Sequence, residues 1–186
     1  PVDEATILSL RDAVDDHHVV VLRGQFLDAA RHERVASGFG RLVAAPVHRL
    51  KGVTATVSTI EDTAERPPAG FDWHTDLSWT RRPPEFGFLN AVVIPPRGGD
   101  TLWVGGAAMY ERLSDDERRW CDEAVAVHAP DPTLLASVER HHGTAMADRL
   151  RTDYPPATHP LVRVHPRTGR PGLFLSPLYV RRLAGP

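Results

Sequence analysis

Residues 71–79 of the chain read FDWHTDLSW, in which His74 and Asp76 are separated by a single residue. The flanking residues favour a strand, and side chains two positions apart in a strand leave the same face. A histidine and a carboxylate placed in this way can supply two of the three ligands of a 2-His-1-carboxylate facial triad, which holds Fe(II) and leaves positions open. With 10 histidines in the chain, about one His-x-Asp match is expected by chance. On spacing alone an ordinary surface ion pair is favoured, so the surrounding sequence has to decide.

Length and composition predict a single globular domain. The chain has 186 residues, of which 41% are hydrophobic and 25% charged, as is typical of soluble proteins. A net charge of −2 is too small to indicate a nucleic-acid or membrane partner, and we find no membrane-spanning run or signal-peptide pattern. The single cysteine, Cys121, excludes an internal disulfide and a cysteine-rich metal site. We therefore expect a cytoplasmic protein in which Cys121 is a small buried hydrophobic residue.

Hydrophobic periodicity predicts helices early in the chain and short strands after them. Helices are expected over residues 5–16 and 28–39, with Gly40 as a C-terminal cap, and after Ser114, where Ser114 and Glu117 match a capping box. Strands are expected over residues 18–22, 52–58, 86–94, 101–104, 161–164 and 172–175, the last two joined as a hairpin. Residues 130–157 are polar and rich in proline, which predicts a lid or an excursion out of the core. This order favours a mainly β fold, a sandwich or jelly roll with helical decoration.

Other residues that could take part in chemistry are ambiguous when considered one at a time. Trp73 and Trp79 flank the His-x-Asp pair, and at least one of them is expected to pack in the core. Thr101 follows a Gly-Gly turn and could donate a hydrogen bond to a carboxylate, although an ordinary turn threonine is favoured on local grounds. His159 and His165 bracket a strand, and we expect both to be tied to the backbone rather than to bind metal.

The order of five short blocks is more specific than any single block. The blocks are VLRGQ (21–25), FG (39–40), WHTD (73–76), GGDTLW (98–103) and HPLVRVHPRTG (159–169). Together they resemble the taurine dioxygenase (TauD/TfdA) family of Fe(II)- and 2-oxoglutarate-dependent oxygenases, over about Val19 to Arg182. The resemblance implies a double-stranded β-helix (jelly-roll) core, Fe(II) and 2-oxoglutarate as cosubstrate. It also implies that O₂ is used to hydroxylate a small, anionic organic substrate while 2-oxoglutarate is converted to succinate and CO₂.

The resemblance also implies roles for individual residues. His74 and Asp76 match the first histidine and the carboxylate of the iron triad, and Thr101 matches the threonine that binds 2-oxoglutarate. Trp73 and Leu77 flank the metal motif, where the family lines its substrate pocket. His48 joins these candidates because taurine-specific members carry other residues at the positions of Ala45 and His48. Taurine itself is therefore not the expected substrate.

Two family motifs are absent from these 186 residues: the one that carries the distal histidine ligand and the one with the arginine that clamps 2-oxoglutarate. We therefore expect residues 1–186 to form a single oxygenase domain that lacks its C-terminal part. The first alternative is a non-catalytic member of the same fold that acts as a binding or interaction protein. The second is a zinc hydrolase that uses His74 and Asp76, for which no further ligand motif is found. A homo-oligomer is left open.

Overall fold

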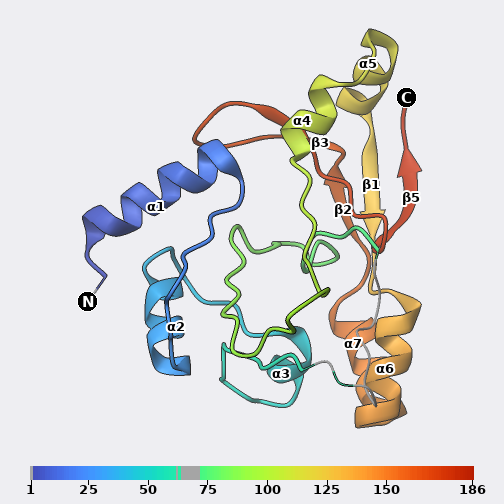
Figure 1. Cartoon of the computed structure of the whole chain (residues 1–186). Coiled ribbons are helices and arrows are strands. Elements are labelled where there is room, and N and C mark those ends of the chain that lie inside the picture. Colours follow the sequence, from blue (N-terminus) through green and yellow to red (C-terminus); the bar gives the residue numbers. More distant parts are fainter. Residues whose placement is uncertain (1, 62, 64–71) are drawn as a thin grey trace.

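The computed structural model describes residues 2–61, 63 and 72–186. The first third of the chain contains three helices, α1 (Glu4–His17), α2 (Ala29–Ser37) and α3 (Pro46–Leu50), coloured blue to teal in Figure 1. The Asp3 side chain accepts the backbone N–H of Thr6 at 2.8 Å and so caps α1. Asp28 caps α2 in the same way, through the N–H of Arg31 at 2.7 Å. The two helices predicted in this region are confirmed.

The end of α2 differs from the prediction. The helix ends at Ser37 and is followed by Gly38 as its cap, so Gly40 does not end the helix. Gly38 lies close to α1, since a Cβ atom at this position would lie only 2.7 Å from Cδ1 of Ile7. The end of α2 thus packs closely against the side chain of a residue on α1, a contact that local sequence does not reveal.

The remaining elements follow residue 105. They are α4 (Gly106–Glu111), α5 (Asp115–Glu123), β1 (Val125–His128), α6 (Pro132–His142), α7 (Thr144–Asp153), β2 (Ala157–Pro160), β3 (Val162–Val164), β4 (Pro171–Leu173) and β5 (Val180–Ala184). An antiparallel sheet has the order β2-β1-β5, so β1 lies between two strands that come later in the chain. β3 and β4 pair antiparallel, with Val162 opposite Leu173 and Val164 opposite Pro171, which confirms the predicted hairpin.

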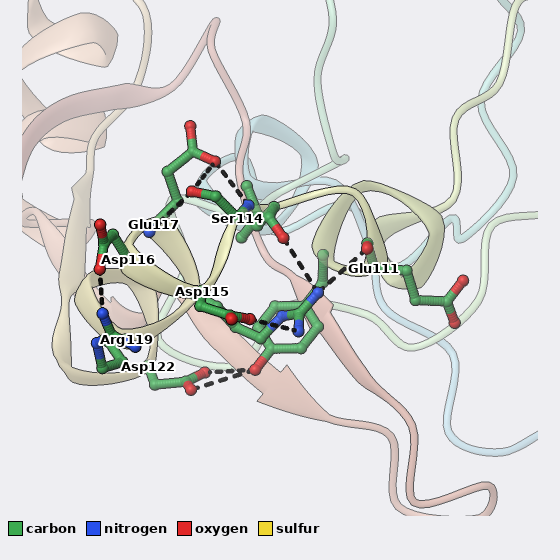
Figure 2. Close-up of polar contacts among 10 residues, drawn as sticks. Glu111, Ser114, Asp115, Asp116, Glu117, Arg119 and Asp122 are labelled. Atoms are coloured by element: carbon green, nitrogen blue, oxygen red, sulfur yellow. Dashed lines mark hydrogen bonds and ion pairs between the residues drawn. The ribbon is translucent and has the colours of Figure 1, made fainter.

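Figure 2 shows the polar contacts at the start of α5. The Glu117 N–H donates to the Ser114 hydroxyl at 3.3 Å, and the Glu117 carboxylate accepts the Ser114 N–H at 2.8 Å. The hydrogen bonds that the carboxylate accepts from the Ser114 N–H and from the Ser114 hydroxyl, the latter at 2.7 Å, lower the pKa of Glu117 below its ordinary value. The capping box predicted from the sequence is therefore confirmed.

Two hydrophobic cores support the C-terminal half. Trp79, Val138, Ala147 and Leu150 are buried together, so α6 and α7 pack against the turn that follows the His-x-Asp motif. Val138 of α6 and Ala147 and Leu150 of α7 are buried, so both helices contribute to this core. The expected role of residues 130–157 as a lid or excursion stays a prediction. The second core contains Cys121, Ala124, Ala126 and Leu161. Burial raises the pKa of the Cys121 thiol, and its predicted place among hydrophobic residues is confirmed.

Several predicted strands are extended segments without a ladder. Residues 18–22, 52–58, 86–94 and 101–104 form no strand in the described part of the chain, although their composition favours one. A strand ladder needs a neighbouring strand that pairs with its backbone N–H and C=O groups. Segments rich in β-branched residues, such as residues 91–94, are instead strongly exposed to solvent, and the side chain of Val93 is 90% exposed. The described residues consequently contain more helix than strand, and the expected predominance of strands is not found among them. None of the helices in the described ranges is long and apolar enough to cross a membrane.

Candidate functional site

The side chains of His74 and Asp76 meet at the molecular surface. His74 Nε2 lies 3.2 Å from Asp76 Oδ1, and the two side chains are 42% and 74% exposed. His74 Nδ1 lies 3.0 Å from the backbone oxygen of Asp72. A carbonyl can only accept, so Nδ1 carries the proton and Nε2 is the nitrogen that turns towards Asp76.

This arrangement fits a bound cation. With the proton on Nδ1, the lone pair of Nε2 and the carboxylate oxygen of Asp76 are two acceptors 3.2 Å apart, which a metal ion can bridge. A ring protonated on both nitrogens would instead donate to Asp76 and form an ordinary ion pair. Two ligand atoms that bind a metal ion at about 2.1 Å and at right angles lie about 3 Å apart, close to the observed separation. A hydrogen bond from the second ring nitrogen to a carbonyl is the usual way in which a metal-binding histidine is oriented. The pair can therefore supply two ligands, and no group of three metal-binding side chains is present among the described residues.

A turn, rather than strand alternation, brings the two side chains together. Residues 72–75 belong to no helix, strand or turn, and residues 76–79 form a turn in which the Ser78 N–H donates to the Thr75 oxygen at 3.2 Å. Leu77 takes a left-handed conformation with φ of 53°, which costs about 1–2 kcal/mol for a residue with a Cβ atom. Its side chain packs on the core around Trp79, so burial offsets the strain. The expected same-face arrangement on a strand is therefore replaced by a packed turn.

Buried polar side chains from distant elements hold this turn. His128 on β1 is fully buried and lies with Nδ1 3.0 Å from the Ser78 hydroxyl. His159 on β2 donates from Nε2 to the backbone oxygen of Thr80 at 3.0 Å. Burial lowers the pKa of His128 to about 4, with smaller contributions from the nearby His159 and Arg181. Sequence analysis did not identify His128, and the stretch Val125–His128 carries no polar and apolar alternation that would have indicated it; burial alternates along β1 only in the structure.

The two C-terminal histidines behave as predicted. His159 is bound to a backbone carbonyl, and His165 accepts the backbone N–H of Thr168 on Nδ1 at 3.2 Å. The other nitrogen of His165 faces Asp15 on α1 at 3.6 Å. Neither ring joins the His74 and Asp76 pair.

The substrate-pocket candidates lie in different environments. Trp73 is 49% exposed, whereas Trp79 is almost fully buried, so one of the two flanking tryptophans packs in the core as predicted. Leu77 points into that core. His48 belongs to α3, which contacts α7, and its Nδ1 is buried without a hydrogen-bond partner among the described residues.

Thr101 does not contact the metal-ligand pair of His74 and Asp76 through a hydrogen bond in the described part of the chain. It follows Gly98 and Gly99, which both take positive φ angles, of 75° and 74°. The threonine is exposed. Its hydroxyl is free to bind a ligand, and its role stays a prediction.

Comparison with known proteins gives one consistent result. The model of the family described as "Taurine catabolism dioxygenase TauD, TfdA family" matches residues 1–186. An alpha-ketoglutarate-dependent sulfate ester dioxygenase from Pseudomonas putida is 32% identical, over 98% of this chain and 61% of that protein. An alkylsulfatase from Acinetobacter baylyi is 29% identical, over 98% of this chain and 58% of that protein. The chain thus spans less than two thirds of the length of either relative.

Solved structures show the same fold. A taurine dioxygenase from Burkholderia xenovorans superposes with a TM-score of 0.68 at 27% identity, covering 100% of this chain and 59% of the other. The structure of AAD-2 in complex with Mn(II) and N-oxalylglycine gives a TM-score of 0.75 at 22% identity, covering 99% of this chain and 68% of the other.

Proposed function

The chain belongs to the taurine catabolism dioxygenase TauD/TfdA family, and on that premise we propose that the protein is an Fe(II)- and 2-oxoglutarate-dependent dioxygenase acting on a small, anionic organic molecule. The observation that carries the proposal is the exposed pair of acceptors, His74 Nε2 and Asp76 Oδ1, at 3.2 Å. Fe(II) and 2-oxoglutarate, when bound, would activate O₂, so that one oxygen atom hydroxylates a substrate C–H bond and the other enters succinate, with release of CO₂. The jelly-roll core implied by the family is part of this proposal, supported by the TM-score of 0.75.

The chain's own residues have distinct tasks in this proposal. His74 binds the metal through Nε2, while its Nδ1–H, donated to the Asp72 oxygen at 3.0 Å, keeps the ring turned towards the site. Asp76 supplies a negative charge that offsets the charge of the dication. The exposed hydroxyl of Thr101 donates to a carboxylate of 2-oxoglutarate. Trp73, Leu77 and His48 contribute to the substrate pocket.

Sulfate esters are the first substrate class to test. The relatives from Pseudomonas putida and Acinetobacter baylyi carry the names sulfate ester dioxygenase and alkylsulfatase. Taurine is disfavoured because Ala45 and His48 stand where taurine-specific members have other residues. We therefore place alkyl sulfates before sulfonates in a substrate screen.

The test uses the full gene product that carries this sequence. Under anaerobic conditions, calorimetry should show that 2-oxoglutarate binds only when Fe(II) is present. In air, His74→Ala and Asp76→Ala should abolish succinate formation, because each removes a metal ligand. Asp72→Asn is the matched control: it neutralises a neighbouring carboxylate but keeps the backbone oxygen that orients His74.

The outcomes separate the alternatives. Succinate formation at the wild-type rate in either ligand variant would refute the assignment of His74 or Asp76. If the wild-type protein binds neither Fe(II) nor 2-oxoglutarate, the non-catalytic binding protein would be favoured instead. Turnover of an ester with Zn(II) and without 2-oxoglutarate would favour the hydrolase.

A further inference from the structure

Ser176 contacts the metal motif from a position 101 residues further along the chain. The residue lies between β4 and β5 and is 0% exposed. Its backbone oxygen closes a turn by accepting the N–H groups of Tyr179 at 2.9 Å and Val180 at 2.8 Å. Its side chain faces the other way, since the hydroxyl accepts the backbone N–H of Thr75 at 3.0 Å.

Thr75 is the residue between the two proposed ligands. The peptide plane that carries its N–H joins His74 to Thr75, so a hydrogen bond on that N–H sets how the His74 Cα–Cβ bond is directed relative to Asp76. The 3.2 Å separation of Nε2 and Oδ1 depends on that direction. Fixing this one amide therefore acts on both ligands.

Residues 176–179, which we call the support turn, contact the motif at three consecutive residues. The Leu178 N–H donates to the Trp73 oxygen at 3.3 Å. The ring of Tyr179 stands edge-on to the ring of His74, with centroids 6.1 Å apart. Together with the Ser176 hydrogen bond, these contacts hold residues 73–75, the segment that leads into the turn at residues 76–79.

We propose that Ser176 is a positioning residue, whose hydroxyl holds the Thr75 amide and thereby keeps His74 and Asp76 at the separation a metal ion needs. The inference rests on the proposed function, because it concerns the metal that these two side chains would bind. A purely structural serine would satisfy a buried N–H and stabilise the fold without any effect on the affinity for metal. The two roles therefore differ in a measurable quantity.

The experiment measures binding of Mn(II) to the full gene product, without 2-oxoglutarate or substrate, together with the midpoint of thermal unfolding. Ser176→Ala should weaken Mn(II) binding about tenfold or more, as for other groups that orient metal ligands. Ser176→Thr, which keeps the hydroxyl, should restore most of that affinity. Ser176→Cys keeps the volume with a weaker acceptor, and it carries the same prediction as Ser176→Ala if that variant does not fold.

Ile7→Ala is the matched control. Ile7 is buried on α1, where it packs against Gly38 and, within the described residues, makes no contact with the segment between the ligands. We expect this variant to lower the unfolding midpoint while leaving Mn(II) affinity within about threefold of wild type, less than the tenfold loss expected for an orienting group.

Each result has one meaning. Unchanged Mn(II) affinity in both Ser176→Ala and Ser176→Cys would overturn the positioning role while leaving the proposed function intact. Equal losses of affinity in Ser176→Ala and Ile7→Ala would overturn it as well, because general destabilisation of the protein would explain both. A wild-type protein that binds neither Mn(II) nor Fe(II) would refute the proposed function and the positioning role together.

Discussion

Acidification should destabilise the protein through His128. This residue is fully buried on β1, with its ring 5.3 Å from the ring of His159 and stacked 5.5 Å from that of Phe174. Its Nδ1 is bonded to Ser78, while its Nε2 is buried without a partner among the described residues. A proton bound to His128 would place a positive charge where water cannot solvate it and near the positive charge of Arg181. Burial therefore lowers the pKa of His128 from 6.5 to about 4, with His159 and Arg181 adding to the effect.

The sign and the size follow from proton linkage. Between pH 6.5 and about pH 4, the unfolded chain binds a proton at His128 that the folded protein does not bind. The free energy of unfolding therefore falls as the pH is lowered through this range, by up to about 1.4 kcal/mol per pH unit. The difference between the two pKa values corresponds to about 3 kcal/mol in total, a large share of the 5–15 kcal/mol that is typical of folded domains.

Urea unfolding followed by tryptophan fluorescence tests this prediction at several pH values between 7 and 4.5. His128→Phe replaces the ring with one that cannot bind a proton, so the variant should lose most of the pH dependence in this range. His141→Gln is the control, because it removes an exposed histidine on α6 and should leave the dependence unchanged. Carboxylates with lowered pKa values, such as Glu117, contribute equally to wild type and to both variants. Equal pH slopes for wild type and His128→Phe would refute the reasoning.

Three further changes have definite expected outcomes. Thr101→Val should weaken 2-oxoglutarate binding in calorimetry because it removes a hydroxyl donor at nearly constant volume, and an unchanged affinity would leave Thr101 as a turn residue only. Leu150→Ala should lower the free energy of unfolding by about 2–5 kcal/mol, since Leu150 is fully buried in the core that supports the turn; a loss below about 1 kcal/mol in urea unfolding would show that the core collapses around the cavity. Ser114→Ala should cost about 1 kcal/mol by removing the cap of α5 and should raise the pKa of Glu117, which NMR titration can follow.

Local features were predictable from the sequence because their causes lie within a few residues. The capping box of Ser114 and Glu117 needs only residues three positions apart, and it forms as expected. The hairpin of β3 and β4 is directed by its own turn residues. The pairing of His74 with Asp76 was also predictable, since one intervening residue brings the side chains close in either a strand or a turn.

Contacts between distant segments were not predictable in the same way. Strand propensity in residues 86–94 says nothing about whether a partner strand lies alongside, and in the described residues none does. The close approach of Gly38 to Ile7 likewise joins two helices that are far apart in the sequence.

The sequence alone therefore determined the chemistry that residues 73–76 can offer and the family to which their order points. The tertiary structure decided what holds those residues in place: a buried hydroxyl at Ser176, a buried ring at His128 and a carbonyl contact from His159. Ser176 and His128 are single polar residues in unremarkable stretches of sequence. They matter because folding removes them from water beside the metal motif, where the Ser176 hydroxyl and Nδ1 of His128 each form a hydrogen bond with it.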